Sequence, residues 1–261
     1  MAVVAQGPSA RRRARFARAL WAGAEATVTV GVVVLLLVVH QLWWTNRQAR
    51  EGAQHKVRAL EREWAEPRGG DHPEQGGASD EAAGEVPAGG SGTGGPRRDQ
   101  GARPRTTPRW DQAYAVLRIP RLGVVAPVAQ GVGKKGVLDK GYVGHYPGTA
   151  QPGEAGNFAV AGHRNTHGEP FRHINRLRAG DEVRVETREA IYLYVVDKGV
   201  AQTSPRDTGV IATVPRSTVQ PSAGYSEPGY YLTLTTCTPE FTSTHRLVVW
   251  AKLTSMRPRT G

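Results

Sequence analysis

The sequence predicts a mainly β domain, a closed or nearly closed β-barrel with a few short helices, behind an N-terminal transmembrane helix and a disordered linker. Three observations predict this arrangement. An apolar run stands near the N-terminus of the 261-residue chain, a Gly- and Pro-rich stretch follows it, and the remainder shows short β-branched runs separated by Gly and Pro. Many short strands at such spacing are typical of barrels and other all-β domains.

Residues 1–19 form a basic arm, in which the arginines are Arg11, Arg12, Arg13, Arg15 and Arg18. The net charge of the chain is +11, but much of the excess lies in this arm and in the Gly- and Pro-rich stretch. No nucleic-acid-binding motif with aromatic platforms accompanies the basic runs, so nucleic acid is not an expected partner.

Residues 20–44 are predicted to form a transmembrane signal anchor. The strictly apolar part is short, but the segment from Leu20 to Trp44 reaches the roughly 20 residues that a bilayer requires. Trp43 and Trp44 suit an interfacial aromatic belt, and no small-x-small cleavage site directly follows the apolar run. The preceding arginines predict a cytoplasmic N-terminus and a C-terminal folded domain outside the cell, in a single-pass cell-membrane protein. A cleaved signal peptide is the alternative.

Residues 45–108 are predicted to be a juxtamembrane segment and a flexible linker. The part from Thr45 to about Trp64 has a composition compatible with a continuing helix. From Ala65 to Pro108 the chain has almost no large apolar residue, so burial cannot offset the entropy of ordering. We expect a tether that lets the domain search for partners, with a partner-ordered binding arm as the alternative.

Residues 109–256 are predicted to be the folded domain, followed by a tail at 257–261. Two short helices are expected at Gly136–Tyr142 and Pro170–Leu177. The expected strands are Ala113–Ile119, Val124–Val128, Asn157–Ala161, Glu182–Thr187, Ile191–Val200, Val210–Thr213, Tyr230–Thr236 and Leu247–Leu253.

Cys237 is the single cysteine, so an intramolecular disulfide is impossible. It follows the alternating strand Tyr230–Thr236, and Pro239 opposes regular continuation of that strand. A thiol at a strand end faces an open edge, which favours a reactive nucleophile over a small buried hydrophobe. Arg246 begins the next apolar strand and would return beside Cys237, where it could stabilise a thiolate or an oxyanion. The alternative for Arg246 is an ordinary charge at a strand edge.

His163 is the candidate acid and base, because it follows the strand-like run Asn157–Ala161 through Gly162 and would lie at a barrel rim. An imidazole there can deprotonate a thiol and protonate a leaving amine. The competing histidines are His145, His167, His173 and His245. Their spacing is irregular and no carboxylate sits at a matching distance along the chain, so neither a metal nor another cofactor is predicted.

Three of these patterns together resemble one enzyme family. The run Thr233–Cys237 followed by Arg246 resembles the Thr-Leu-x-Thr-Cys signature and trailing arginine of sortases, and Ala161–Arg164 resembles their histidine motif. The run Gly144–Ala150, continued to the histidine motif, is most similar to class E sortases of high-GC Gram-positive bacteria. The resemblance covers roughly Ala113–Leu253 and implies a sortase-type closed β-barrel.

The resemblance also implies a cysteine transpeptidase. Cys237 would attack the Thr–Gly bond of a C-terminal sorting signal and form a thioacyl enzyme. His163 would protonate the departing amine and later activate the incoming one, while Arg246 would hold the substrate backbone and the oxyanion. Similarity to class E implies a Leu-Ala-x-Thr-Gly signal rather than Leu-Pro-x-Thr-Gly.

Three further residues are substrate-binding candidates. Thr236 matches a family position that contacts the substrate, although it could be a plain strand residue. Tyr142 or Tyr146 could donate a hydrogen bond to the amide that the Ala form of the signal exposes, although such tyrosines more often pack.

The implied partners are surface proteins with a C-terminal sorting signal, the amine of a lipid-linked peptidoglycan precursor, and the membrane. Other functions stay open. A cysteine endopeptidase would transfer the acyl group to water with the same residues, and a sortase of the pilin-polymerising type would transfer it to another protein. In a non-catalytic wall-binding domain, Cys237 would be buried and the basic surface would hold an anionic polymer.

Overall fold

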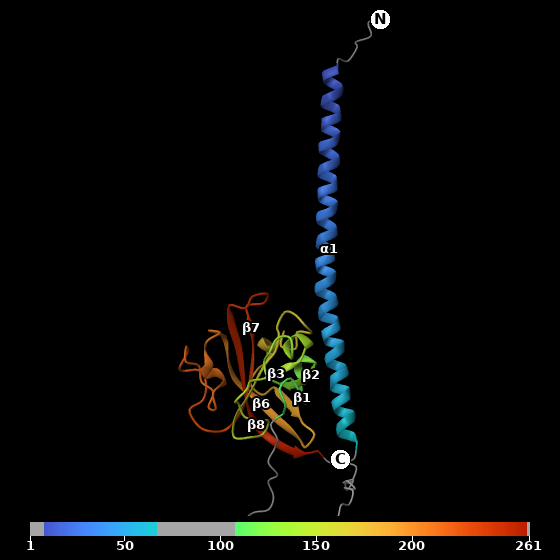
Figure 1. Ribbon diagram of the computed structural model, residues 1–261. Coiled ribbons are helices and arrows are strands. Elements are labelled where there is room, and N and C mark those ends of the chain that lie inside the picture. The colour runs from blue at the N-terminus through green and yellow to red at the C-terminus, as the bar shows by residue number, and fades with distance from the viewer. Residues whose placement is uncertain (1–7, 67–107, 260–261) are drawn as a thin grey trace, which may run out of the picture.

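The computed structural model describes residues 8–66 and 108–259 of the chain. It contains a long helix, α1 (Pro8–Ala65), and a β-barrel packed beside the C-terminal part of this helix (Figure 1). Residues 1–7 of the predicted basic arm, 67–107 of the predicted linker and 260–261 of the predicted tail lie outside the described residues.

The described strands close into a barrel in the order β1-β2-β3-β4-β7-β8-β6-β5. Neighbouring strands are antiparallel, except that β2 pairs with β3 and β4 pairs with β7 in parallel. The predicted closed barrel behind a long apolar helix is therefore confirmed. The strands are β1 (Ala113–Ile119), β2 (Val124–Gln130), β3 (Val143–His145), β4 (Gly156–Ala161), β5 (Glu182–Glu186), β6 (Ala190–Thr203), β7 (Tyr230–Thr238) and β8 (His245–Pro258).

The predicted strand Val210–Thr213 is wrong. Thr208–Ile211 forms the 3-10 helix η4, and Val210 packs against the outside of the barrel beside Trp250. The Val210 carbonyl accepts a hydrogen bond from the Trp250 indole at 3.1 Å. The apolar side chain of Val210 is therefore buried in a small second core outside the barrel, and not in a strand.

The two predicted helices are each reduced to one 3-10 turn. Within Gly136–Tyr142 only η2 (Leu138–Lys140) is helical, and within Pro170–Leu177 only η3 (Ile174–Arg176) is. Another 3-10 turn, η1 (Pro120–Leu122), joins β1 to β2. The three-residue strand β3 is absent from the sequence prediction, because Gly144 at its centre interrupts any β-branched pattern. The last strand, β8, continues two residues past the predicted domain end at residue 256.

Strands β7 and β8 have two different faces. Leu232 and Leu234 point into the barrel core, opposite Ala251 and Val249 of β8. The alternate positions pack on the outer face, where Trp250 is fully buried under the segment that contains η4. This alternation decides which way the last residues of β7 point.

Helix α1 has two contrasting parts. The apolar residues from Leu20 to Trp44 are all exposed, and this is the helix of the described chain that is long and apolar enough to cross a membrane. Beyond it, side chains on one face pack on β1, β2 and the segment before η2. Each buried Val or Leu there contributes about 1.5–3 kcal/mol. The buried residues of this face are Ala49, Ala53, Val57, Leu60 and Trp64.

Candidate active site

Cys237 and Arg246 are direct partners across β7 and β8. Residues opposite each other in an antiparallel pair place their side chains on the same face. The preceding pair, Thr236 and Leu247, is buried on the core side, so Cys237 and Arg246 point to the outer face near the barrel rim. The thiol of Cys237 is free and partly exposed, as a nucleophile must be.

The side chain of Arg246 is fixed by the loop between β7 and β8. Its Nη1 donates to the carbonyls of Ser243 and His245, both at 3.0 Å. A guanidinium has five N–H donors, so Nη2 and Nε add three more on the same planar group. A charged group with this many donors suits a substrate backbone or an oxyanion beside Cys237.

His163 lies at the same rim as Cys237. Ala161 of β4 pairs with Thr235 of β7, and His163 and Cys237 each follow two residues later. The side chain of Arg164 ties the two chain ends together, because its Nη1 donates to the Cys237 carbonyl at 3.2 Å and to Thr238 Oγ1 at 2.8 Å. This buried arginine entered the sequence analysis only as part of the histidine motif, with no role of its own.

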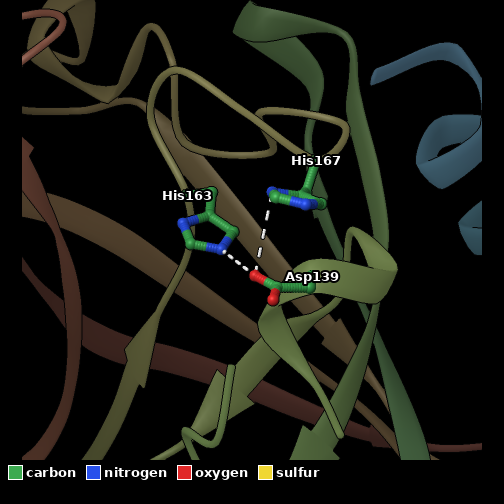
Figure 2. Close-up of side chains that lie close together, drawn as sticks. All are labelled: Asp139, His163 and His167. Carbon is green, nitrogen blue, oxygen red and sulfur yellow. Dashed lines mark hydrogen bonds and ion pairs between the residues drawn. The ribbon is translucent and has the colours of Figure 1, made fainter. Parts of the chain in front are cut away.

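His163 is oriented by a carboxylate that the sequence analysis missed. Its Nε2 lies 2.9 Å from Oδ1 of Asp139 on η2, and both side chains are partly exposed (Figure 2). A carboxylate at Nε2 favours the tautomer protonated there and holds the ring in place. The two residues are 24 positions apart along the chain, and no local pattern links them.

His167 completes this cluster. Its ring centroid is 5.4 Å from that of His163, and its Nδ1 is 3.7 Å from Asp139 Oδ1 (Figure 2). One ligand atom from each of the three residues lies within 4.8 Å of the others, so the set could hold a divalent cation. A cation bound through Nε2 of His163 and Oδ1 of Asp139 would replace the hydrogen bond between them. The prediction of no metal relied on spacing along the chain and did not foresee this carboxylate.

The substrate-binding candidates have different surroundings. Thr236 is buried, and its Oγ1 donates to the Gly162 carbonyl at 2.8 Å, which favours its reading as a plain strand residue. Tyr142 packs against the cluster under α1, where burial raises its pKa. Tyr146 lies closer to the nucleophile, since its hydroxyl is 3.1 Å from Thr235 Oγ1, two residues before Cys237.

The competing histidine His145 has a structural environment. It is fully buried on β3, where its Nδ1 lies 2.9 Å from Gln130 Oε1 and 2.8 Å from the Tyr114 hydroxyl. Its Nε2 is 3.1 Å from the Ala150 carbonyl. Burial lowers the pKa of His145 to about 4, so the ring is neutral at physiological pH. It has no exposed face toward the rim.

A pocket of about 380 Å³ lies between α1 and the barrel, beside the rim. Its lining includes Arg50, Glu169 and Arg172 but neither Cys237 nor His163. This pocket therefore arises from the packing of α1 against the barrel and does not include the candidate catalytic groups.

Comparison with known proteins agrees with this geometry. Residues 117–254, more than half of the chain, match the sortase domain family. Sortase SrtE1 of Streptomyces coelicolor is 40% identical over 240 residues, which cover 90% of this chain and 57% of that protein. Sortase SrtE2 of the same organism is 31% identical over 256 residues, covering 95% and 87% of the two chains. This chain thus spans little more than half the length of SrtE1.

Solved structures give the same result. The crystal structure of sortase E1 from Streptomyces coelicolor with a tripeptide in the active site is 49% identical, with a TM-score of 0.54 over 57% of this chain and 92% of that one. Sortase E from Streptomyces avermitilis is 45% identical, with a TM-score of 0.51 over 57% and 93%. With the family domain, two relatives and the barrel in agreement, the chain belongs to the sortase family and is similar to its class E members.

Proposed function

We propose that the chain is a membrane-anchored cysteine transpeptidase that cleaves a C-terminal sorting signal between Thr and Gly. The observation that carries this proposal is the meeting of Cys237, Arg246 and His163 at one rim. The first two are cross-strand partners, and the third follows the strand beside them.

In the first half-reaction the thiolate of Cys237 attacks the carbonyl carbon of the signal's Thr. Donors on Arg246 stabilise the oxyanion of the tetrahedral intermediate. The C–N bond to Gly breaks, and His163 gives its proton to the departing amine. The product is a thioester on Cys237.

In the second half-reaction an acceptor amine attacks the thioester. His163 takes the proton of the amine, and the thiolate of Cys237 leaves. Asp139 acts through His163 as a positioning residue, because its Oδ1 accepts a hydrogen bond from Nε2–H and leaves Nδ1 for proton transfer. His163 is thus ready to serve as acid and then as base.

We infer a Leu-Ala-x-Thr-Gly signal from the similarity to class E members. Tyr146 is the better of the two tyrosine candidates, because its hydroxyl lies beside the nucleophile strand while Tyr142 packs under α1. The acceptor proposed is the amine of a lipid-linked peptidoglycan precursor. An N-terminal helix suited to anchoring supports work at the membrane, with the N-terminus in the cytoplasm and the barrel outside the cell.

The test uses the full chain in lipid nanodiscs beside its Cys237→Ala twin. Both receive Leu-Ala-x-Thr-Gly and Leu-Pro-x-Thr-Gly peptides with a glycine-based amine, and mass spectrometry identifies the products. We expect the amine joined to Thr, with the Ala peptide preferred and no product from the twin. Hydrolysis alone would identify an endopeptidase. No reaction, with Cys237 also unreactive to a small thiol reagent, would favour the wall-binding domain.

A further inference from the structure

The turn that carries Asp139 and the loop that carries His163 are both attached to helix α1. The turn at η2, which carries Asp139, ends at Gly141, and a Cβ there would lie 2.9 Å from the Ala49 carbonyl. This glycine has a φ of +77°, so close approach and backbone conformation both require it. The loop that carries His163 reaches α1 at Gly168, whose N–H donates to Asn46 Oδ1 at 2.6 Å.

Ion pairs and one cation–π contact also hold α1 on the barrel. Arg50 of α1 contacts Glu169 at 2.9 Å, and the carboxylate of Glu169 is nearly buried between this arginine and Arg172. Farther along the helix, Arg118 of β1 pairs with Glu61, and the guanidinium of Arg259 lies over the Trp64 ring at 4.7 Å. The helix is therefore attached along its whole length from Asn46 to Trp64.

The first of these contacts falls at the end of the apolar span. Asn46 is two residues beyond Trp44, which is about 3 Å along a helix that rises 1.5 Å per residue. In a bilayer spanned by Leu20–Trp44, the loop that carries His163 would thus lie at the level of the headgroups. The other end of the docked segment, at Trp64, would lie about 30 Å from Trp44.

The orientation of the barrel agrees with this placement. Figure 1 shows the end of the barrel formed by the loop between β7 and β8 toward the N-terminal part of α1. This loop follows Cys237 and bears Phe241, whose side chain is 75% exposed. An exposed Phe at this position suits insertion of its apolar ring into the boundary between headgroups and acyl chains.

We propose that the segment Asn46–Trp64 is a fixed part of the catalytic domain and holds the Cys237 rim against the lipid headgroups. This inference rests on the membrane anchorage proposed above and replaces the expected search on a long tether. Trp64 packs in the same cluster as Ala113 of β1, so both ends of the segment 66–108 lie on the barrel. Helix α1 itself therefore joins the barrel to the apolar span. The sorting signal is held at the membrane by its own hydrophobic tail, and the acceptor amine is held there by its lipid. Both would then meet the rim at the level of the headgroups.

Depth-dependent quenching tests the inference in the full chain, in nanodiscs that contain lipids spin-labelled at the headgroup. A fluorophore is attached through Phe241→Cys, Thr45→Cys or Met256→Cys, each in the Cys237→Ala background. Met256 is the matched control, because it is also an exposed apolar side chain but lies on β8 near its C-terminal end. We expect similar quenching at positions 45 and 241 and none at 256.

A second variant separates docking from anchorage. Ala53→Glu with Val57→Lys places charges on the docked face, and Gln48→Glu with Gln54→Lys places the same charges on exposed positions. The first pair should abolish quenching at 241 and preserve it at 45, while the second pair should change neither.

Quenching at 45 without quenching at 241 in the otherwise native chain would overturn the inference, whether or not the docked-face variant folds. No quenching at 45 would overturn the anchorage and the inference together. Since these chains lack the Cys237 thiol, the result does not depend on transpeptidation. Strong quenching at position 241, together with a native chain that shows no transpeptidation, would contradict the proposed activity but not the docking.

Discussion

His145 and His163 lie on neighbouring parts of one barrel and have opposite surroundings. His145 is fully buried, with hydrogen-bond partners at both ring nitrogens, and burial lowers its pKa to about 4. His163 is partly exposed at the rim, with a carboxylate at one nitrogen. Exposure and a charged partner, rather than the residue type, therefore make a histidine suitable for proton transfer.

Substitution of these two histidines should affect activity very differently. His163→Ala should lower kcat/KM for the signal peptide by roughly 10²–10⁴-fold, because the leaving amine and the incoming amine both lose their proton-transfer group. His145→Gln should retain activity per folded molecule. Steady-state kinetics on equal amounts of folded chain measure both. Equal losses in the two variants would contradict the comparison.

The second prediction concerns stability against pH. The folded-state pKa of His145, about 4, lies below its ordinary value of 6.5, so between these pH values the unfolded chain binds more protons. The free energy of unfolding should fall by about 3 kcal/mol as pH drops from above 6.5 to 4 through this group.

Urea unfolding of the native chain and of His145→Gln, over the same pH range, isolates this contribution. The variant should show a shallower pH dependence, together with a loss of about 1–3 kcal/mol at pH 7 from imperfectly paired partners such as Gln130. If the unfolding free energies of the two chains changed equally with pH, folding would not lower the pKa of His145.

The third prediction concerns the carboxylate of Asp139, which contacts His163. Asp139→Asn should lower kcat by about 10-fold, because a neutral amide oxygen holds the Nε2–H of His163 less firmly than a carboxylate does. KM should change little, since Asp139 does not hold the substrate. His167→Asn is the matched control from the same cluster and should have a smaller effect. An unchanged kcat in Asp139→Asn would reduce Asp139 to a structural contact.

The smallest expected effect is on the choice of signal. Tyr146→Phe should lower the preference for the Ala peptide over the Pro peptide by a few-fold, since one hydrogen bond contributes about 0.5–1.5 kcal/mol. Tyr142→Phe should leave the preference unchanged, because Tyr142 packs under α1. Competition between the two peptides, read by mass spectrometry, measures the ratio. An unchanged ratio in Tyr146→Phe would remove the tyrosine from recognition.

The barrel was largely predictable because its strands alternate and its turns contain Gly and Pro. β1 was predicted with its observed bounds. Short elements were not predictable: β3 has three residues around a glycine, and Val210 belongs to a satellite core that only the fold creates. Apolar character predicts burial more safely than it predicts the kind of element that is buried.

The candidate site shows the same division. The pairing of Cys237 with Arg246 follows from two strands joined by a short loop, and the sequence contains that information. The contact of His163 with Asp139 joins a loop to a turn 24 residues away, and the docking of α1 joins the N-terminal segment to both. Such contacts arise from closure of the barrel and leave no periodic pattern in the chain.

Capture of the acyl group is the most direct measurement. The full chain in nanodiscs is incubated with a Leu-Ala-x-Thr-Gly peptide and no added amine, stopped with acid, digested and examined by mass spectrometry. An adduct on the peptide that contains Cys237, with Gly released and hydroxylamine removing the adduct, is the predicted result. In the His145→Gln variant the adduct should still form, and in His163→Ala it should be strongly reduced. Release of Gly with no adduct on Cys237, or an adduct on another residue, would contradict the assignment of Cys237 as the nucleophile.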